Sequence, residues 1–290
     1  PQASAMVEPS QGIHLVFDHT FLRGDTAIMV PHTSDGRVLF GIPWHGHTVV
    51  GTTDTPIDAP SYDPLPMDQE IDFILETAER YLSRPPTRAD VLSVYVGIRP
   101  LVKAARSDSG KTSALSRDHT IHVDNSGLLT IAGGKWTTYR HMAEDCVDHA
   151  ITLARLDEKP CVTRNLHIHG YREEIDDLGP LGVYGSDAAA IQALAASDAS
   201  LASPLDPALP YIAAEVVWGA REEMARTVDD VLSRRTRALF LNAHAAQRMI
   251  EPVARILARE LHHDEAWMRS QIESTSALAA KYVVPATTNN

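Results

Sequence analysis

Short apolar runs separated by polar turns dominate the first hundred residues of the chain. Runs of this length that are rich in Val, Ile and Phe favour β-strands, and their close repetition is typical of an antiparallel sheet. The expected strands span residues 13–17, 27–30, 38–42, 48–50 and 91–96.

One well-marked helix interrupts these strands. From Asp68 to Leu82 apolar residues recur every three or four positions, and Pro85 and Pro86 follow. This spacing predicts an amphipathic helix whose apolar face packs against other elements. Asp68 is expected to cap it, since a side-chain oxygen at a helix start accepts a free backbone N–H. The pattern indicates packing and no chemistry.

A strand, a glycine turn and a second helix are predicted between residues 127 and 150. The apolar run at 128–132 is bounded by glycine, which favours a buried strand. Gly133 and Gly134 allow a sharp turn and close approach to a ligand. Beyond the turn, apolar residues fall at helical spacing, and Thr137 or Thr138 is expected to cap this helix.

This arrangement suits negative charge. Free N–H groups and the helix dipole point the same way at a helix start, and Lys135 adds a full positive charge there. The segment is not a phosphate-binding P-loop, because that motif requires Gly at position 129 and Ser or Thr at position 136. Those positions hold Leu129 and Trp136. A turn whose glycines serve only packing is the alternative reading.

The composition changes after Arg155. Residues 157–160, Asp-Glu-Lys-Pro, resemble a linker, and helical spacing of Ala, Leu and Ile dominates from Asp187 onward. The expected helices span about 187–196, 207–218, 221–232, 244–260 and 264–282. We therefore expect an all-helical C-terminal domain.

Charge and composition exclude several classes of function. The net charge of −12 argues against a nucleic-acid partner, which requires a basic face, but leaves a small anionic ligand possible. The two cysteines form no C-x-x-C pair, and no apolar run reaches the ~18 residues of a membrane-spanning helix. The H-x-H pairs His45/His47 and His167/His169 lack a third ligand, so we expect surface histidines and no metal centre.

Three cations stand in settings unusual for a lysine-poor acidic chain. Arg99 ends an apolar strand, and Pro100 holds its backbone extended. Arg117 lies beside Asp118, so an ion pair between these neighbours is the simplest interpretation from sequence. Lys135 lies in the glycine-rich turn. A surface ion pair is the corresponding alternative for Arg99.

Four segments together resemble the FAD-dependent glycerol-3-phosphate dehydrogenases, the respiratory, quinone-linked enzymes of bacteria and of the mitochondrial inner membrane. They are Gly51–Pro56, Gly97–Leu101, Ser116–His119 and Gly133–Arg140, and the match continues through Ser233–Arg237 and Leu241–Asn242. They occur in the order and at the approximate spacing of that family.

The resemblance implies an α+β fold with three parts. Residues 1–125 form an antiparallel-sheet substrate domain with the helix at 68–82. Residues 126–156 form the returning strand, turn and helix of an FAD-binding domain of the glutathione-reductase or amino-acid-oxidase type. Residues 165–290 form the C-terminal helical domain. The implied reaction is oxidation of sn-glycerol 3-phosphate to dihydroxyacetone phosphate, with FAD as cofactor and quinone as electron acceptor.

The resemblance also assigns roles to individual residues. Arg99 and Lys135 are implied to be catalytic. Substrate contacts are implied for Thr52, Arg99, Arg117 and Lys135. Contacts with the flavin are implied for Gly133, Gly134, Lys135, Trp136, Thr137 and Thr138. No residue is identified as the general base. The GTTD segment contributes Thr52 as a contact, whereas Asp54 is expected to be structural.

Further implications concern partners and location. Peripheral association with the cytoplasmic face of a bacterial inner membrane is expected, with the mitochondrial inner membrane as the alternative and a homodimer possible. The basic cluster 233–237 is expected to be a solvated face, with docking to the flavin-binding body or to an anionic membrane as the alternative.

Three other functions remain open. One is an oxidase that uses dioxygen, the second an amine or amino-acid oxidase with the same flavin architecture, and the third a non-catalytic fragment without bound flavin. The third arises because the chain has no G-x-G-x-x-G fingerprint and no initiator Met. We therefore expect the chain to be a portion of a longer enzyme.

Overall fold

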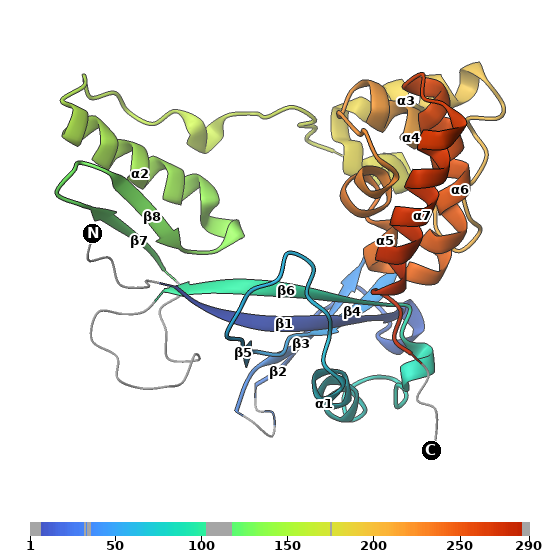
Figure 1. Ribbon diagram of the computed structural model, residues 1–290, viewed down its shortest axis with the longest axis horizontal. Helices are drawn as coiled ribbons and strands as arrows, with labels where there is room; N and C mark the ends of the chain where they lie inside the picture. The colour runs from blue at the N-terminus through green and yellow to red at the C-terminus, as the bar shows by residue number, and fades with distance from the viewer. Residues whose placement is uncertain (1–6, 32, 34–35, 103–117, 175, 286–290) are drawn as a thin grey trace. The chain divides into compact units, whose positions relative to one another are not determined.

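The computed structural model describes residues 7–31, 33, 36–102, 118–174 and 176–285 (Figure 1). Two compact units share these residues. The first unit contains 1–12, 54–64 and 97–168, and the second contains 13–53, 65–96 and 169–290. Within the described residues, no helix has the length and apolar character that crossing a membrane requires.

The larger sheet contains six strands. They are β1 (Val7–Asp18), β2 (Ile28–Val30), β3 (Leu39–Trp44), β4 (His47–Gly51), β5 (Thr55–Pro56) and β6 (Ser93–Val102). The order is β2-β3-β4-β1-β5, and β6 also pairs with β1. Strands β1 and β4, β1 and β5, β2 and β3, and β3 and β4 pair antiparallel, with His14 of β1 opposite Gly51 of β4. The expected antiparallel sheet is confirmed.

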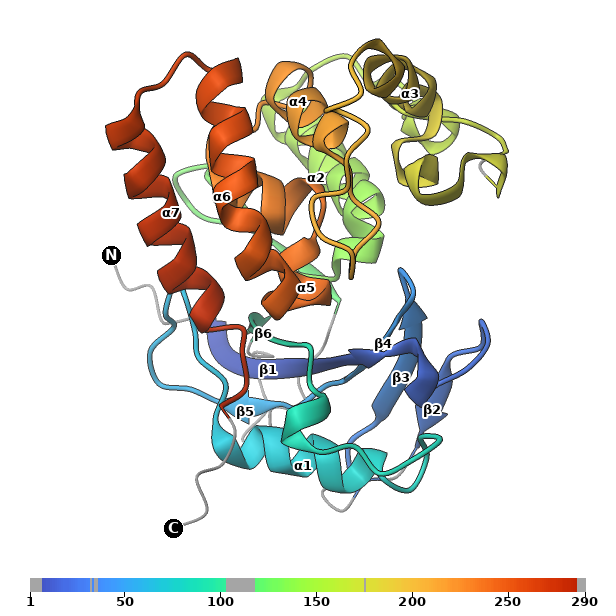
Figure 2. The same ribbon diagram turned by 90° about the vertical axis from the view of Figure 1, so that its right-hand side faces the viewer.

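Helix α1 (Asp68–Ala78) lies along one face of the strands of the second unit (Figure 2). Alternate residues of β1 point toward it, so Ile13, Leu15 and Phe17 are fully buried with Ile71 and Ile74 of the helix. The buried residues of α1 recur every three or four positions, and a continuous apolar run forms the buried part of β1, which explains why the sequence pattern located both elements.

The expected cap of α1 is wrong by one position. Met67 is the N-cap residue, and the carboxylate of Glu70 accepts its backbone N–H at 3.1 Å. Asp68 is instead the first helical residue, and its carboxylate forms an ion pair with Arg88 at 2.7 Å. The carboxylate of Glu70 thus binds the N–H of the N-cap residue itself, and the carboxylate of Asp68 binds Arg88 rather than a helical N–H.

Buried polar contacts hold the Gly51–Pro56 segment against α1. The hydroxyl of Thr53 donates to Glu70 at 3.0 Å and accepts the backbone N–H of Ile13 at 3.0 Å. Thr53 and Glu70 are both buried, so these groups have lost hydration and depend on each other. One hydroxyl therefore connects β1, the GTTD segment and the helix.

The C-terminal part of the second unit is helical, as expected. Its helices are α3 (Ala188–Ser197), α4 (Ala213–Arg221), α5 (Ala238–Leu241), α6 (Ala243–Glu260) and α7 (Glu265–Ala280). Helices α6 and α7 lie side by side (Figure 2) and contribute to a core with α4 and α5. The buried hydroxyl of Ser93 donates to the carbonyl of Leu239 at 2.8 Å, which ties β6 to α5.

Two of the expected helices are wrong in their bounds. The helix expected at 207–218 begins only at Ala213, because Pro207 and Pro210 hold the preceding backbone out of the helical region. The helix expected at 221–232 is replaced by a bend and a π-helical turn at Asp230–Arg235.

The first unit contains a separate two-stranded sheet. Strands β7 (His119–Val123) and β8 (Leu129–Gly133) pair antiparallel, and helix α2 (Tyr139–Ala154) follows (Figure 1). No residue of α2 is buried, and the side chains of Val147 and Leu153 are about half exposed. This strand, turn and helix match the elements expected from sequence at 127–150, but the expected burial of the strand is wrong, because every residue of β8 is partly exposed.

We predict that Thr53→Val destabilises the second unit, because it leaves the N–H of Ile13 and one oxygen of Glu70 without their partner. A buried unsatisfied polar group costs about 1–3 kcal/mol. The midpoint of denaturant unfolding should fall, and amide hydrogen exchange at Ile13 should accelerate. Thr53→Ser, which keeps the hydroxyl, is the matched control. Equal exchange at Ile13 in Val and Ser variants would contradict the assigned role.

A second prediction concerns Glu215, which is buried in α4. Burial raises the pKa of this carboxyl from 4.5 to about 7, outweighing its hydrogen bonds from the Ile212 N–H and the Tyr184 hydroxyl. The folded state thus binds the proton more tightly than the unfolded state. This contribution to stability is full below about pH 4.5 and disappears as the pH rises through about 7.

Glu215→Gln mimics the protonated acid and should remove this pH dependence. Relative to the native protein, the variant should be equally stable near pH 4.5 and more stable by up to about 3 kcal/mol above pH 7.5, at about 1.4 kcal/mol per pKa unit. Unfolding titrations at several pH values measure the difference. A stability difference that does not change with pH would contradict the raised pKa.

Candidate functional site

The turn after β8 requires glycine for reasons internal to the fold. Gly133 and Gly134 have φ angles of +78° and +80°, which side-chain-bearing residues rarely adopt. A Cβ on Gly133 would lie 2.8 Å from the carbonyl oxygen of Asp118, and one on Gly134 would lie 2.4 Å from the sulfur of Met142. The chain's own packing therefore accounts for both glycines, which is the alternative that the sequence left open.

The chain then passes through Lys135 into a short 3-10 turn and α2. The expected cap is wrong. Thr138 occupies the N-cap position of α2, but its hydroxyl donates to the carbonyl of Lys135 at 3.0 Å and accepts no helical N–H. In the described chain, the N–H groups of Trp136 and Thr137 meet no acceptor. Two backbone donors thus remain open beside the ammonium of Lys135.

A cavity of about 340 Å³ lies at this turn. It is lined by Ile98, Arg99, Pro100 and Leu101 from β6 and by Gly133, Gly134, Lys135 and Trp136. Its volume lies near the lower end of the range of ligand sites, about 300–1,000 Å³. Two segments more than thirty residues apart thus bring Arg99 and Lys135 to the wall of one cavity.

Arg99 is held by an acidic partner from the GTTD segment. Its Nη1 lies 3.4 Å from Oδ1 of Asp54, and the two side chains are only 28% and 13% exposed. The hydroxyl of Ser10 also donates to Asp54. The ion pair anticipated as the alternative for Arg99 is present, but it lies in a mostly buried setting and at the edge of the cavity.

The remaining expected site residues are placed as follows. Thr52 belongs to the second unit, and its hydroxyl donates to the carbonyl of Thr53 at 3.1 Å. Trp136 is 84% exposed and its ring stacks on Tyr139 with centroids 5.4 Å apart. Thr137 is exposed. Arg117 lies outside the described residues.

Sequence reasoning missed a histidine–carboxylate pair behind the turn. His119 of β7 lies 2.7 Å through Nε2 from Oδ2 of Asp145 on α2. This hydrogen bond lowers the pKa of Asp145. The pair fixes α2 against β7, on the two sides of the turn that carries Lys135. The only sequence feature that pointed to this pair was the position of His119 in the Ser-Arg-Asp-His segment.

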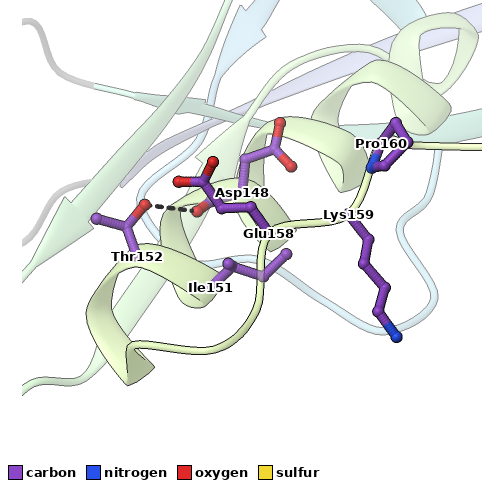
Figure 3. A pocket seen from close by; sticks show the side chains of 6 residues that line it. All are labelled: Asp148, Ile151, Thr152, Glu158, Lys159 and Pro160. Atoms are coloured by element: carbon purple, nitrogen blue, oxygen red, sulfur yellow. Dashed lines mark hydrogen bonds between the residues drawn. The ribbon is translucent and has the colours of Figure 1, made fainter.

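A larger hollow on the same unit suits an anion poorly. About 500 Å³ in volume, it is lined by Asp148, Ile151, Thr152, Glu158, Lys159 and Pro160 (Figure 3). The figure shows Lys159 extending away from Asp148 and Glu158. Two carboxylates on its wall repel a negatively charged ligand.

The histidine pairs have ordinary partners. His47 contacts the carbonyl of His45 at 2.8 Å, and His169 lies 2.6 Å from Asp187. Among the described residues there is no group of three or more His, Cys, Asp and Glu side chains that could hold a metal ion.

Comparison with known proteins agrees with this architecture. Residues 1–140 match the family described as FAD dependent oxidoreductase, and residues 129–268 match the C-terminal domain of alpha-glycerophosphate oxidase. A solved structure of the glycerol-3-phosphate dehydrogenase from Bacillus halodurans complexed with FAD aligns with a TM-score of 0.77 and 29% identity. The alignment covers 98% of this chain and 59% of that one.

Curated relatives agree with the solved one. The chain is 38% identical over 294 residues to the probable mitochondrial glycerol-3-phosphate dehydrogenase of Caenorhabditis elegans, covering 93% of this chain and 40% of the relative. The mitochondrial glycerol-3-phosphate dehydrogenase of Homo sapiens is 38% identical over 94% of this chain and 40% of its own length. The chain thus spans about 40% of these relatives. The expected resemblance to the FAD-dependent glycerol-3-phosphate dehydrogenases and the α+β fold class are therefore confirmed.

Proposed function

We propose that this chain is the substrate-holding and C-terminal portion of an enzyme that oxidises sn-glycerol 3-phosphate to dihydroxyacetone phosphate with FAD. The observation that carries the proposal is the convergence of Arg99 and Lys135 on one cavity beside the glycine turn. An acidic protein with a local pair of cations on a cavity wall is suited to a small acidic substrate.

The residues at the turn fit the flavin end of FAD. Lys135 and the two open N–H groups of Trp136 and Thr137 can donate to an electron-rich ring edge that becomes negative on reduction. When bound, FAD supplies the acceptor for the hydride that leaves C2 of the substrate. Gly133 and Gly134 contribute the backbone path that exposes these donors, and Thr138 fixes it by its bond to the Lys135 carbonyl.

Charge balance assigns the substrate contacts. Asp54 offsets part of the charge of Arg99, so Lys135 and the Arg99–Asp54 pair together leave about one net positive charge. A phosphate monoester carries nearly two negative charges at neutral pH. We propose Arg117 as the further cation that completes the site, with Arg99 nearer the reacting carbon. The planar guanidinium of Arg117 can make two charge-assisted hydrogen bonds to a phosphate.

We further propose that residues 126–156 complete an FAD-binding domain whose main part lies in a preceding segment. The support is the surface of α2. A helix within a finished domain buries one face, whereas none of the residues of α2 is buried. The half-exposed Val147 and Leu153 are suitable contacts for such a segment. The domain limits 1–125 and 165–290 are proposed from the family resemblance.

Quinone is the proposed electron acceptor, with peripheral attachment to the membrane that carries it and a possible homodimer. The relatives from Caenorhabditis elegans and Homo sapiens are named as mitochondrial proteins, which favours the mitochondrial inner membrane over the bacterial one. Transfer to dioxygen is the alternative, since one matching domain is described from an oxidase. Peroxide formed in proportion to substrate oxidised would support the oxidase.

We predict that Lys135→Met in the full-length enzyme raises KM for glycerol 3-phosphate by about 10- to 100-fold, the equivalent of one lost charge-assisted hydrogen bond. Steady-state kinetics measures the change, and absorbance in the flavin bands reports the cofactor content. Lys159→Met is the matched control, because Lys159 lies on the acidic hollow of the same unit. Equal KM values in the two variants would show that Lys135 does not bind the substrate.

Asp54→Asn should lower kcat/KM by about tenfold, because the guanidinium of Arg99 loses the charge that orients it. Flavin content should be unchanged. Asp58→Asn, at an exposed position of the same segment, is the control. A double-mutant cycle with Arg99→Gln separates positioning from stability. If the two substitutions add independently in kcat/KM, Asp54 does not act through Arg99.

A further inference from the structure

The basic cluster Ser233–Arg237 divides into paired and unpaired arginines. Arg234 forms ion pairs with Asp229 and Asp230 at 2.5 and 3.2 Å. The guanidinium of Arg235 donates to the carbonyl of Glu223 at 3.0 Å, with the carboxylate 3.6 Å away. The cluster is therefore not a uniform solvated face, and its third arginine is in a different setting.

The side chain of Arg237 has no hydrogen bond or ion pair to any residue in the part of the chain that the structure describes, whereas its backbone carbonyl accepts the N–H groups of Phe240 and Leu241. Its backbone is left-handed, with φ of +59°, which is unusual for a long side chain. The side chain is only partly exposed and lies in the wall of a cavity of about 270 Å³. An unpaired, half-buried guanidinium has lost hydration without gaining an acceptor, so a ligand with one would stabilise it.

The rest of the cavity wall comes from several elements of the second unit. It contains His45, Gly46, Pro180, Val183, Tyr184, Pro210, Tyr211, Arg235 and Thr236. Tyr211 is only 8% exposed, and its hydroxyl has no hydrogen-bond partner among the described residues. Burial raises the pKa of Tyr211 to about 12, so the hydroxyl remains a donor at neutral pH. A guanidinium and a phenol thus offer donors to one cavity.

The acidic groups around the cavity already have other partners. Glu223 is occupied by Arg235, and Glu215 accepts the hydroxyl of Tyr184 at 3.0 Å. Because burial raises the pKa of Glu215 to about 7, its negative charge is only partial at neutral pH. His45 is uncharged there, since burial, followed by the charges of Arg237 and His47, lowers its pKa. The uncompensated charge of the cavity is therefore positive.

We propose that this cavity is a second ligand site that binds a small oxyanion, a phosphate or a carboxylate, through the guanidinium of Arg237 and the hydroxyl of Tyr211. A planar guanidinium matches the paired oxygens of both groups. Pro180, Val183 and Pro210 provide an apolar wall for a short carbon skeleton, and the volume limits the ligand to a small molecule. The site is independent of the proposed oxidation reaction and uses none of its residues.

The test follows His45 by NMR in the full-length protein, with histidines isotopically labelled and the resonance assigned by its loss in His45→Asn. Inorganic phosphate and benzoate are titrated separately at ionic strength held constant with sodium chloride. Either anion should shift the His45 resonance saturably and raise its pKa, because it neutralises Arg237. A response to phosphate alone or to benzoate alone identifies which oxyanion the site takes.

Variants then locate the binding. Arg237→Gln should weaken the response at least about tenfold, Arg237→Lys should retain part of it, and Arg234→Gln should leave it unchanged. Circular dichroism and the thermal midpoint confirm that each variant is folded. Equal affinities in Arg237→Gln and Arg234→Gln, or no response of His45 to either anion in the native protein, would overturn the proposal. The NMR readout does not involve substrate turnover. The outcome of this test is therefore distinct from the outcome of a test of the oxidation reaction.

Discussion

Bringing positive charges together on a cavity wall is unfavourable unless something holds them, and the candidate active site depends on how the chain does this. Arg99 lies within β6 with its guanidinium 3.4 Å from Asp54, in a pair that is mostly shielded from water. Asp54 is positioned in turn by the hydroxyl of Ser10 on β1. The carboxylate reduces repulsion between Arg99 and Lys135 without cancelling the attraction of the cavity for a dianion.

The second side of that cavity is built by local geometry. Two glycines in the left-handed region reverse the chain after β8 and bring Lys135 opposite the end of β6. The contact between His119 and Asp145 holds α2 and β7 on either side of the reversal. Because Gly133 and Gly134 are required by the packing of Asp118 and Met142, loss of flavin on replacing them would not separate cofactor contact from a disturbed turn.

Sequence patterns predicted helices and strands well where local periodicity determines the structure. They predicted side-chain contacts poorly where the partner is distant in the sequence. The apolar run of β1 and the helical spacing of α1 follow from burial of these elements in one core, and the helical spacing of α2 was predicted correctly although none of its residues is buried. The expected capping hydrogen bonds do not form, because the carboxylate of Asp68 binds Arg88 and the hydroxyl of Thr138 donates to the Lys135 carbonyl. The partner of Asp54 is 45 residues away, and the isolation of Arg237 depends on which acids Arg234 and Arg235 have already engaged.

The two proposed sites rest on the same principle, that a cation with incomplete compensation inside a cavity favours an anion. The central claim is that Arg99 and Lys135 both contact one substrate molecule, at its phosphate or at the adjoining carbon. A crystal structure of the full-length protein with bound glycerol 3-phosphate tests it most directly. The account predicts a phosphate oxygen within about 2.7–3.2 Å of Lys135 Nζ, with Arg99 contacting the same molecule. A ligand that contacts neither side chain would contradict it.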